Sequence, residues 1–230
     1  MSSQRIRVWF RKGDRVRYIS HLDVLRYWER AIRRAGLPLS YPQGFTPHPK
    51  LAFAGPLPLG YAADADIMDI TFDERVDPGT IAERLAPQSS EDLALIAAVE
   101  VPLSNPPPQS VLLWADYRVD VPGLDPADAA AALGAFLART EFPWTEERRD
   151  KSKSYDLRAM VASAAATAID GGGRIACRMR ASQENMARPE QLLAALFPGF
   201  EGQDFCRVSL VLDEVSPARD LYRRKGRFLE

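Results

Sequence analysis

The order of strand-like and helix-like segments is the same on both sides of a proline-rich stretch, and this repetition constrains the fold more than any other feature. Residues 102–109 contain four prolines in eight positions, which is typical of a linker between folded units. On each side, the hydrophobic periodicity predicts the order β-α-β-β-α-β. That order is characteristic of the ferredoxin-like arrangement. We therefore predict an α+β protein with two ferredoxin-like (β-α-β-β-α-β) halves in tandem.

The boundaries of the predicted units follow from this repeat. We expect a first half at 1–102, a linker at 103–110, a second half at 111–216 and a basic tail at 217–230. The first half has predicted strands at 5–10, 39–41, 50–54, 67–72 and 93–101, a helix of about fifteen residues after Ser20, and a helix at 78–86. The second has strands at 113–121, near 155–161, at 174–180 and at 205–212, and helices at 126–139 and 189–197. The triple glycine 171–173 predicts a hairpin turn between its two middle strands.

Composition restricts the class of protein. No run approaches the roughly 18 consecutive apolar residues of a membrane helix, and no apolar signal region follows the N-terminus. We therefore expect a cytoplasmic protein without a membrane partner. The two cysteines, Cys177 and Cys206, are too few and too far apart for a zinc or iron–sulfur site. We expect them to be buried apolar residues, and we expect no metal and no cofactor.

Charge is distributed unevenly along the first half. Residues 1–50 contain eleven Lys/Arg against three Asp/Glu, whereas residues 51–110 contain two against ten. Such a separation can direct an anion such as nucleic acid to one face of a protein. The alternative is that the two regions pair with each other inside the molecule.

The first predicted helix has distinct start and stop signals and a basic side. Ser20 stands at the N-cap with Asp23 three residues later, and Gly36 stands at the end. At 100° per residue, three arginines fall within roughly 60° of one another, away from the apolar stripe. These are Arg26, Arg30 and Arg33, and Arg34 adds a fourth charge nearby. Guanidinium groups pair well with phosphates, although a solvated charged face would give the same pattern.

The segment after this helix mixes aromatic rings, prolines and cations. Its candidate binding residues are Tyr41, Gly44, Phe45, His48 and Lys50, with Pro47 and Pro49 stiffening the chain. Single-stranded nucleic acid binds such combinations, so Tyr18, Phe45 and His48 could stack on a base while Lys50 meets a phosphate. The alternative is a stiff connection in which Phe45 packs inward.

The chain has two histidines, His21 and His48, which are the candidate acid/base residues of a metal-independent ribonuclease. Their spacing in the sequence does not show whether the two side chains lie close together. His21 belongs to the first turn of the predicted helix, where a packing or capping role is also expected. Asp64, Asp66 and Asp69 lie close in sequence, but strand alternation favours outward-facing acids over a metal site. No phosphate loop, dinucleotide fingerprint or Ser-His-Asp order is present.

Four runs together carry a resemblance to a known family. They are 17–23 (RYISHLD), 29–38 (ERAIRRAGLP), 44–50 (GFTPHPK) and 56–60 (PLPLG). Because of these runs, the chain resembles the bacterial radical SAM-linked protein family, a conserved domain of unknown function. The resemblance is most specific over residues 5–75. The family's signature positions then correspond to Ser20, His21, Asp23, Arg30, Arg33, Arg34, Gly44, Phe45, Pro47, His48, Pro49, Lys50 and Gly60.

The chain departs from the family pattern at two further positions, in and beside the run 44–50, and in its second half. Thr46 replaces the usual asparagine and Gln43 the usual acid, which argues against a role for those side chains. The second half has no counterpart of the Ser-His-Leu-Asp or Gly-Phe-Thr-Pro-His-Pro-Lys runs. If the halves arose as a repeat, only the first kept the site.

The resemblance implies a radical SAM enzyme as the partner. The leading hypothesis is a non-catalytic accessory protein that binds ribosomal or transfer RNA for a separately encoded radical SAM enzyme. One alternative is a metal-independent endoribonuclease that uses His21 or His48. The other is a protein-interaction module that docks on the enzyme without RNA. The tail with its five basic residues between 219 and 227 either extends the binding surface or forms a soluble end.

Overall fold

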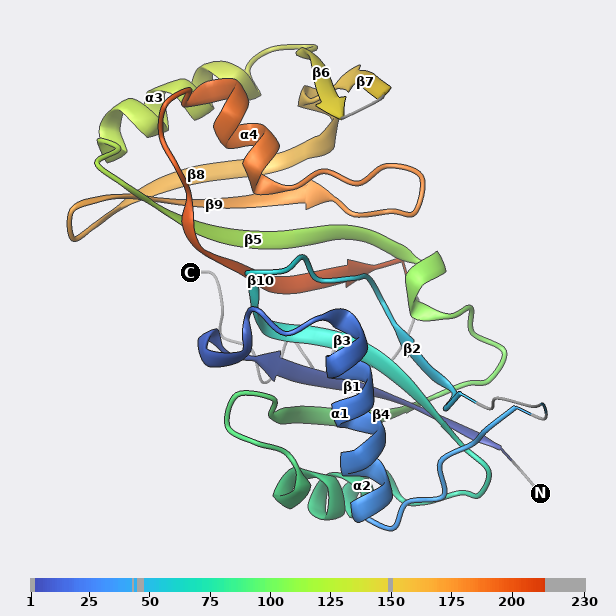
Figure 1. Ribbon diagram of the computed structural model, residues 1–230. Coiled ribbons are helices and arrows are strands. Elements are labelled where there is room, and N and C mark those ends of the chain that lie inside the picture. Colours follow the sequence, from blue (N-terminus) through green and yellow to red (C-terminus); the bar gives the residue numbers. More distant parts are fainter. Residues whose placement is uncertain (1–2, 43, 45–47, 149–150, 214–230) are drawn as a thin grey trace.

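The computed structural model describes residues 3–42, 44, 48–148 and 151–213. In the first half of this chain the elements are β1 (Gln4–Lys12), α1 (His21–Arg34), β2 (Leu51–Phe53), β3 (Ala62–Phe72), α2 (Pro78–Leu85) and β4 (Leu95–Val101). In the second they are β5 (Leu112–Pro122), α3 (Pro126–Leu137), β6 (Pro143–Arg148), β7 (Lys151–Asp156), β8 (Val161–Ile169), β9 (Gly172–Arg180), α4 (Pro189–Leu196) and β10 (Gln203–Leu212). Figure 1 shows this mixed α/β arrangement.

One large sheet runs through both halves. Its strand order is β4-β1-β3-β10-β5-β9-β8, with the short β2 paired to β3 as an eighth strand. The pairings are antiparallel except where β3 meets β10. That parallel pairing has two residue pairs, Ala62 with Cys206 and Ala63 with Arg207. The two halves therefore join through a short stretch of backbone at the centre of the sheet (Figure 1).

The helices of both halves lie on one face of this sheet. Residues directly opposite each other on paired strands share a face of the sheet. From β1 to β5, the opposite residues are Lys12, Ala63, Arg207 and Tyr117. Lys12 and Tyr117 therefore lie on the same face. Tyr117 belongs to the core beneath α3 and α4. Lys12 lies beside Phe10, which packs against the buried Trp28 of α1. Two apolar cores thus lie side by side on the same face, one beneath each pair of helices.

The predicted elements correspond to those of the structure with several differences. β3 begins at Ala62, five residues before its predicted start, and β8 shares only Val161 with the strand predicted near 155–161. The strand predicted at 39–41 is only a single bridge from Leu39 to Phe72, because the chain turns away after one pairing. The segment predicted near 155–161 is not one strand, since a 3-10 turn at Arg158–Met160 separates the end of β7 from β8. The β6–β7 hairpin was not predicted. The hairpin turn predicted at the triple glycine is present between β8 and β9, but it consists of Asp170 and Gly171 (φ 76°), because Gly172 and Gly173 already belong to β9.

The proline-rich segment packs closely against the first half. The Arg5 guanidinium donates to the carbonyls of Pro102 and Asn105, and Pro108 is buried in a short 3-10 turn. The predicted basic tail lies outside the described residues. Within the described chain, no helix combines the length and the apolar character needed to cross a membrane.

Candidate functional site

The first helix is fixed at both ends by the residues predicted to cap it. The Ser20 hydroxyl accepts from the backbone N–H of Asp23 at 3.2 Å, and the Asp23 carboxylate accepts from the backbone N–H of Ser20 at 3.3 Å. At the other end Gly36 has a φ of 64°, and the N–H of Leu37 donates to Ile32 O at 3.2 Å. Between these caps the apolar side of α1, with Val24, Trp28 and Ile32, is buried, so the opposite side faces solvent.

The outward side of α1 carries the basic face, which we define as Arg26, Arg30 and Arg33. All three side chains are exposed. Arg26 lies 3.7 Å from Asp23, and because both side chains are more than half exposed this ion pair contributes little to stability. Neither Arg30 nor Arg33 forms a hydrogen bond or ion pair with any residue that the structure describes. Arg34 points elsewhere and donates to the side chain and carbonyl of Gln88.

A shallow groove of about 560 Å³ follows the C-terminal half of α1. Its lining residues are Glu29, Arg33, Leu37, Pro38, Leu39 and Tyr41. The Tyr41 hydroxyl donates to the Glu29 carboxylate at 3.1 Å, and burial together with this carboxylate raises the pKa of Tyr41. The groove therefore brings together two of the predicted binding residues, Arg33 and Tyr41.

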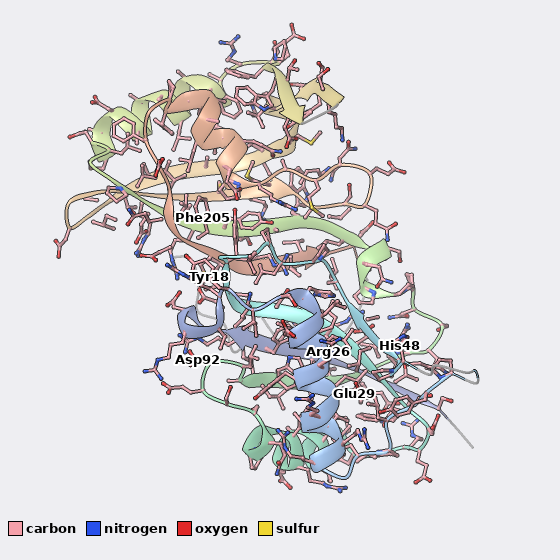
Figure 2. All side chains as sticks on the ribbon, viewed as in Figure 1. Tyr18, Arg26, Glu29, His48, Asp92 and Phe205 are labelled. Atoms are coloured by element: carbon pink, nitrogen blue, oxygen red, sulfur yellow. The ribbon has the colours of Figure 1, made fainter. Side chains whose placement is uncertain are left out.

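The segment before β2 presents its polar residues to solvent. His48, Lys50 and Gly44 are exposed, whereas Pro49 is buried. The backbone of Lys50 is held by Ser40, which accepts from its N–H at 3.0 Å. Phe45 and Pro47 lie outside the described residues, as do Gln43 and Thr46. Figure 2 draws His48 on the other side of α1 from Tyr18.

Two loops that are distant in sequence meet beside the beginning of α1. The N–H of Gly60 donates to Arg17 O at 3.0 Å, which joins the loop before α1 to the loop before β3. Gly60 has a φ of 86°, and an added Cβ would lie 3.5 Å from the Tyr18 ring. Around this junction three apolar side chains are exposed. They form the apolar patch, defined as Tyr18 (67% exposed), Leu22 (59%) and Leu59 (65%).

Buried charges hold these two loops in place. Lys12 donates from Nζ to Arg17 O at 2.9 Å and to Ile19 O at 3.4 Å. Arg207, from the last strand of the other half, donates to both Asp66 oxygens at 2.7 Å. The same guanidinium donates to Gly55 O at 3.0 Å and Pro56 O at 3.2 Å. Each of the three charged residues is only 3–5% exposed, so solvent screens these interactions little.

His21 lies between these buried charges and solvent. Its ring packs edge-on against Phe53, with the centroids 4.7 Å apart, at the edge of a cavity of about 10 Å³. The cavity is lined by Phe10, Lys12, His21, Val24, Phe53, Leu57 and Asp66 and is about the size of one water molecule. Burial lowers the pKa of His21, and Arg207 and Lys12 act in the same direction against the opposing effect of Asp66. The imidazole is therefore neutral at pH 7, the form that can accept a proton.

A family profile decides the classification of the chain. Residues 5–189 match the profile of DUF2344, described as an uncharacterised protein conserved in bacteria. The chain belongs to this family. The match covers the first half from residue 5 onward, together with β5 to β9. It therefore includes the basic face and the apolar patch of this DUF2344 protein.

Similarity beyond the family is weak. No curated protein matches the sequence. One similar solved structure is a protein of unknown function from Galdieria sulphuraria, with 14% identity, 90% of this chain and 100% of that chain covered, and a TM-score of 0.27. Another is described as a candidate glycine cleavage system transcriptional repressor, with 13% identity, 93% and 100% coverage, and a TM-score of 0.25. These scores are too low to support a conclusion about fold or function.

The two histidines of this DUF2344 protein do not form a pair among the described residues. The charged groups that act on His21 are Asp66, Arg207 and Lys12, and its ring contact is with Phe53. An acid/base pair of His21 with His48 therefore has no support in the geometry of the described chain.

The prediction that the aspartates of β3 face outward was wrong for two of them. Asp66 and Asp69 are 3% and 2% exposed. Asp69 accepts two hydrogen bonds from the buried Arg7, at 2.7 and 2.9 Å, and Asp66 accepts from Arg207. Nine of the eleven residues of β3 are buried, at successive positions that point to opposite faces of the sheet, so its polar positions are buried too. The basic and acidic regions thus pair in part within the molecule.

The remaining candidate metal ligands do not form a cluster among the described residues. In the described part of the chain, no three His, Cys, Asp or Glu residues are grouped so that they could hold a metal ion. Cys177 and Cys206 are buried as predicted, and burial raises the pKa of both thiols to about 12. Both cysteines are therefore inert thiols in the core. Sequence reasoning missed Lys12 and Arg207, whose roles depend on contacts across the sheet.

Proposed function

We propose that this DUF2344 protein is an accessory RNA-binding protein whose basic face on α1 contacts phosphates. The observation that supports this most directly is the state of its arginines. Most arginines of the described chain donate to a carboxylate or a carbonyl, as Arg7, Arg174 and Arg207 do. Arg30 and Arg33 are exposed without such a partner. Their positive charge is thus available to an anion from outside the chain.

The position of the basic face supports an extended ligand. Arg26 to Arg33 spans seven residues of helix, which is about 10 Å along the axis. The groove with Tyr41 lies beside Arg33, and the exposed Lys50 follows on the neighbouring segment. A single-stranded backbone with its regularly spaced phosphates suits such a row better than an isolated small anion.

The experiment is RNA binding measured by fluorescence anisotropy as a function of salt. Each phosphate contact to single-stranded RNA contributes about 0.7 to the slope of log K against log salt. The double variant Arg30→Ala and Arg33→Ala should therefore bind more weakly and lower the slope by about 1.4. Arg11→Ala is the matched control, because Arg11 is also exposed and has no side-chain partner among the described residues. Absence of RNA binding at low salt contradicts the proposal.

The finer parts of the proposal concern architecture, partner and compartment. Each half contains the order β-α-β-β-α-β, which supports two ferredoxin-like halves with the β6–β7 hairpin as an insertion. The resemblance to the radical SAM-linked family supports a separately encoded radical SAM enzyme as the partner, acting in the cytoplasm. Co-purification with that enzyme after nuclease treatment tests whether the two proteins associate without RNA. Association without any RNA affinity would favour a pure protein-interaction module.

A second candidate function rests on His21 alone. Its neutral imidazole, which lies beside Phe53 at the edge of the small cavity, could remove a 2′-hydroxyl proton in metal-independent RNA cleavage. Incubation of RNA with the protein in EDTA, compared with the His21→Gln variant, tests this activity. Cleavage that is absent, or equal in both proteins, excludes His21 as the base.

A further inference from the structure

The apolar patch and the basic face are continuous along one side of α1. Leu22, Arg26 and Arg30 follow one another at intervals of four residues, which places them on the same side of a helix. Leu22 belongs to the first turn, where Tyr18 and Leu59 from the adjoining loops complete the patch. The surface therefore changes from apolar to basic within two turns of one helix.

The ring of Tyr18 is held in position although it is exposed. The Arg17 guanidinium lies 5.1 Å from the centre of the ring, and Arg17 is itself fixed by Asp204 at 2.6 Å. Gly60 lies against the ring edge, where a side chain would be in contact. A ring positioned in this way loses little conformational entropy when a planar ligand stacks on it.

The loops that carry the patch are anchored to the interior. Lys12 holds the loop before α1 through the carbonyls of Arg17 and Ile19. Arg207 holds the loop before β3 through the carbonyls of Gly55 and Pro56. Exposed apolar side chains on anchored loops are typical of a surface that is shaped before its ligand arrives.

We propose that the apolar patch is a stacking site for an unpaired base of single-stranded RNA whose phosphates continue along the basic face. This inference rests on the proposed RNA-binding function and adds a preference for single strands. A duplex buries the faces of its bases, whereas a single strand can place one on an exposed tyrosine. The adjoining arginines supply the charge complementarity that selects a nucleic acid as occupant of the patch rather than an apolar protein segment.

The test compares a labelled twelve-residue oligouridylate with a twelve-base-pair RNA duplex and with inorganic polyphosphate. At fixed salt, the protein should bind oligouridylate more tightly than either the duplex or polyphosphate. Loss of one stacked base weakens binding by about 5- to 150-fold, so Tyr18→Ala should lose this factor for the single strand. Polyphosphate binding should change less than twofold. Tyr18→Phe retains the ring and should restore binding, which separates stacking from a folding defect.

Leu103→Ala is the matched control, because Leu103 is an exposed apolar residue on the segment after β4. It should leave all three affinities unchanged. Failure of the wild-type protein to bind any RNA overturns the proposed function and this inference together. Equal affinity for single strand and duplex, or single-strand binding that Tyr18→Ala leaves unchanged, overturns the inference while RNA binding stands. An equal loss for oligouridylate and polyphosphate in Tyr18→Ala also overturns it.

Discussion

The substitution Arg207→Met is expected to be among the most destabilising single changes in this protein. Arg207 and Asp66 form a buried ion pair, and the same guanidinium satisfies two loop carbonyls. Removing one partner of a buried pair costs about 3–5 kcal/mol, because the remaining charge has no water to solvate it. Nearby Lys12 partly compensates Asp66, so we expect a value near the lower end, about 3 kcal/mol.

The matched control for this substitution is Arg178→Met. Arg178 also forms two hydrogen bonds to an aspartate on the adjacent strand, Asp116, but its side chain is 39% exposed. Asp116 is itself only 9% exposed, but it keeps the hydrogen bond from the Ser209 hydroxyl at 2.6 Å, and water can enter where the more exposed guanidinium lay. The expected cost is therefore about 1 kcal/mol or less. The two variants therefore make the same chemical change at different depths.

Urea unfolding followed by circular dichroism measures both variants. With a slope of about 2 kcal/mol per molar, the midpoint should fall by about 1.5 M for Arg207→Met and by less than about 0.5 M for Arg178→Met. Adding Asp66→Asn to Arg207→Met removes the uncompensated charge and should recover part of the loss. Equal midpoints for the two single variants would refute the argument that burial sets the cost.

Three further predictions concern α1 and its neighbouring loop. Ser20→Ala removes the N-cap hydroxyl and should lower the unfolding free energy by about 1 kcal/mol in the same urea assay, and an unchanged midpoint would contradict this capping role. In a histidine NMR titration, the resonance that disappears in His21→Gln should titrate below pH 6.5, because burial lowers the His21 pKa. Since the unfolded state then binds more protons, the stability contributed by neutral His21 is present above pH 6.5 and falls as the pH drops toward the lowered pKa. A measured His21 pKa at or above 6.5 would contradict the partly buried position of the ring. Gly60→Ala should cost about 1 kcal/mol at a φ of 86°, which a thermal melt can check against Gly134→Ala, a helical position with open space.

Local signals predicted those elements whose residues carry the information themselves. The helix after Ser20 has a cap, an apolar stripe and a terminal glycine, and it was predicted closely. The β6–β7 hairpin was missed because Glu146, Lys153 and their neighbours give it no apolar alternation. The burial of Asp66 and Asp69 was missed because alternation of apolar and polar residues within β3 does not show that both faces of this strand are buried.

The candidate site was predicted only in part for the same reason. The basic face follows from helical spacing within fourteen residues, so it could be recognised in the sequence. The apolar patch combines Tyr18 with Leu59, and its anchor combines Asp66 with Arg207, 141 residues away. No periodicity relates positions that far apart. Such contacts depend on strand order, which the sequence pattern left open.

The short pairing between β3 and β10 also limits when the sheet can finish folding during synthesis. Every other described strand is synthesised before β10, which inserts between β3 and β5. Until β10 arrives, the first half has no Arg207, and the carbonyls of Gly55 and Pro56 have no guanidinium donor. A nascent or truncated chain would therefore carry α1 and its arginines without the anchored loop beside them. The surface around Tyr18 thus acquires its final shape only once the last strand has been added.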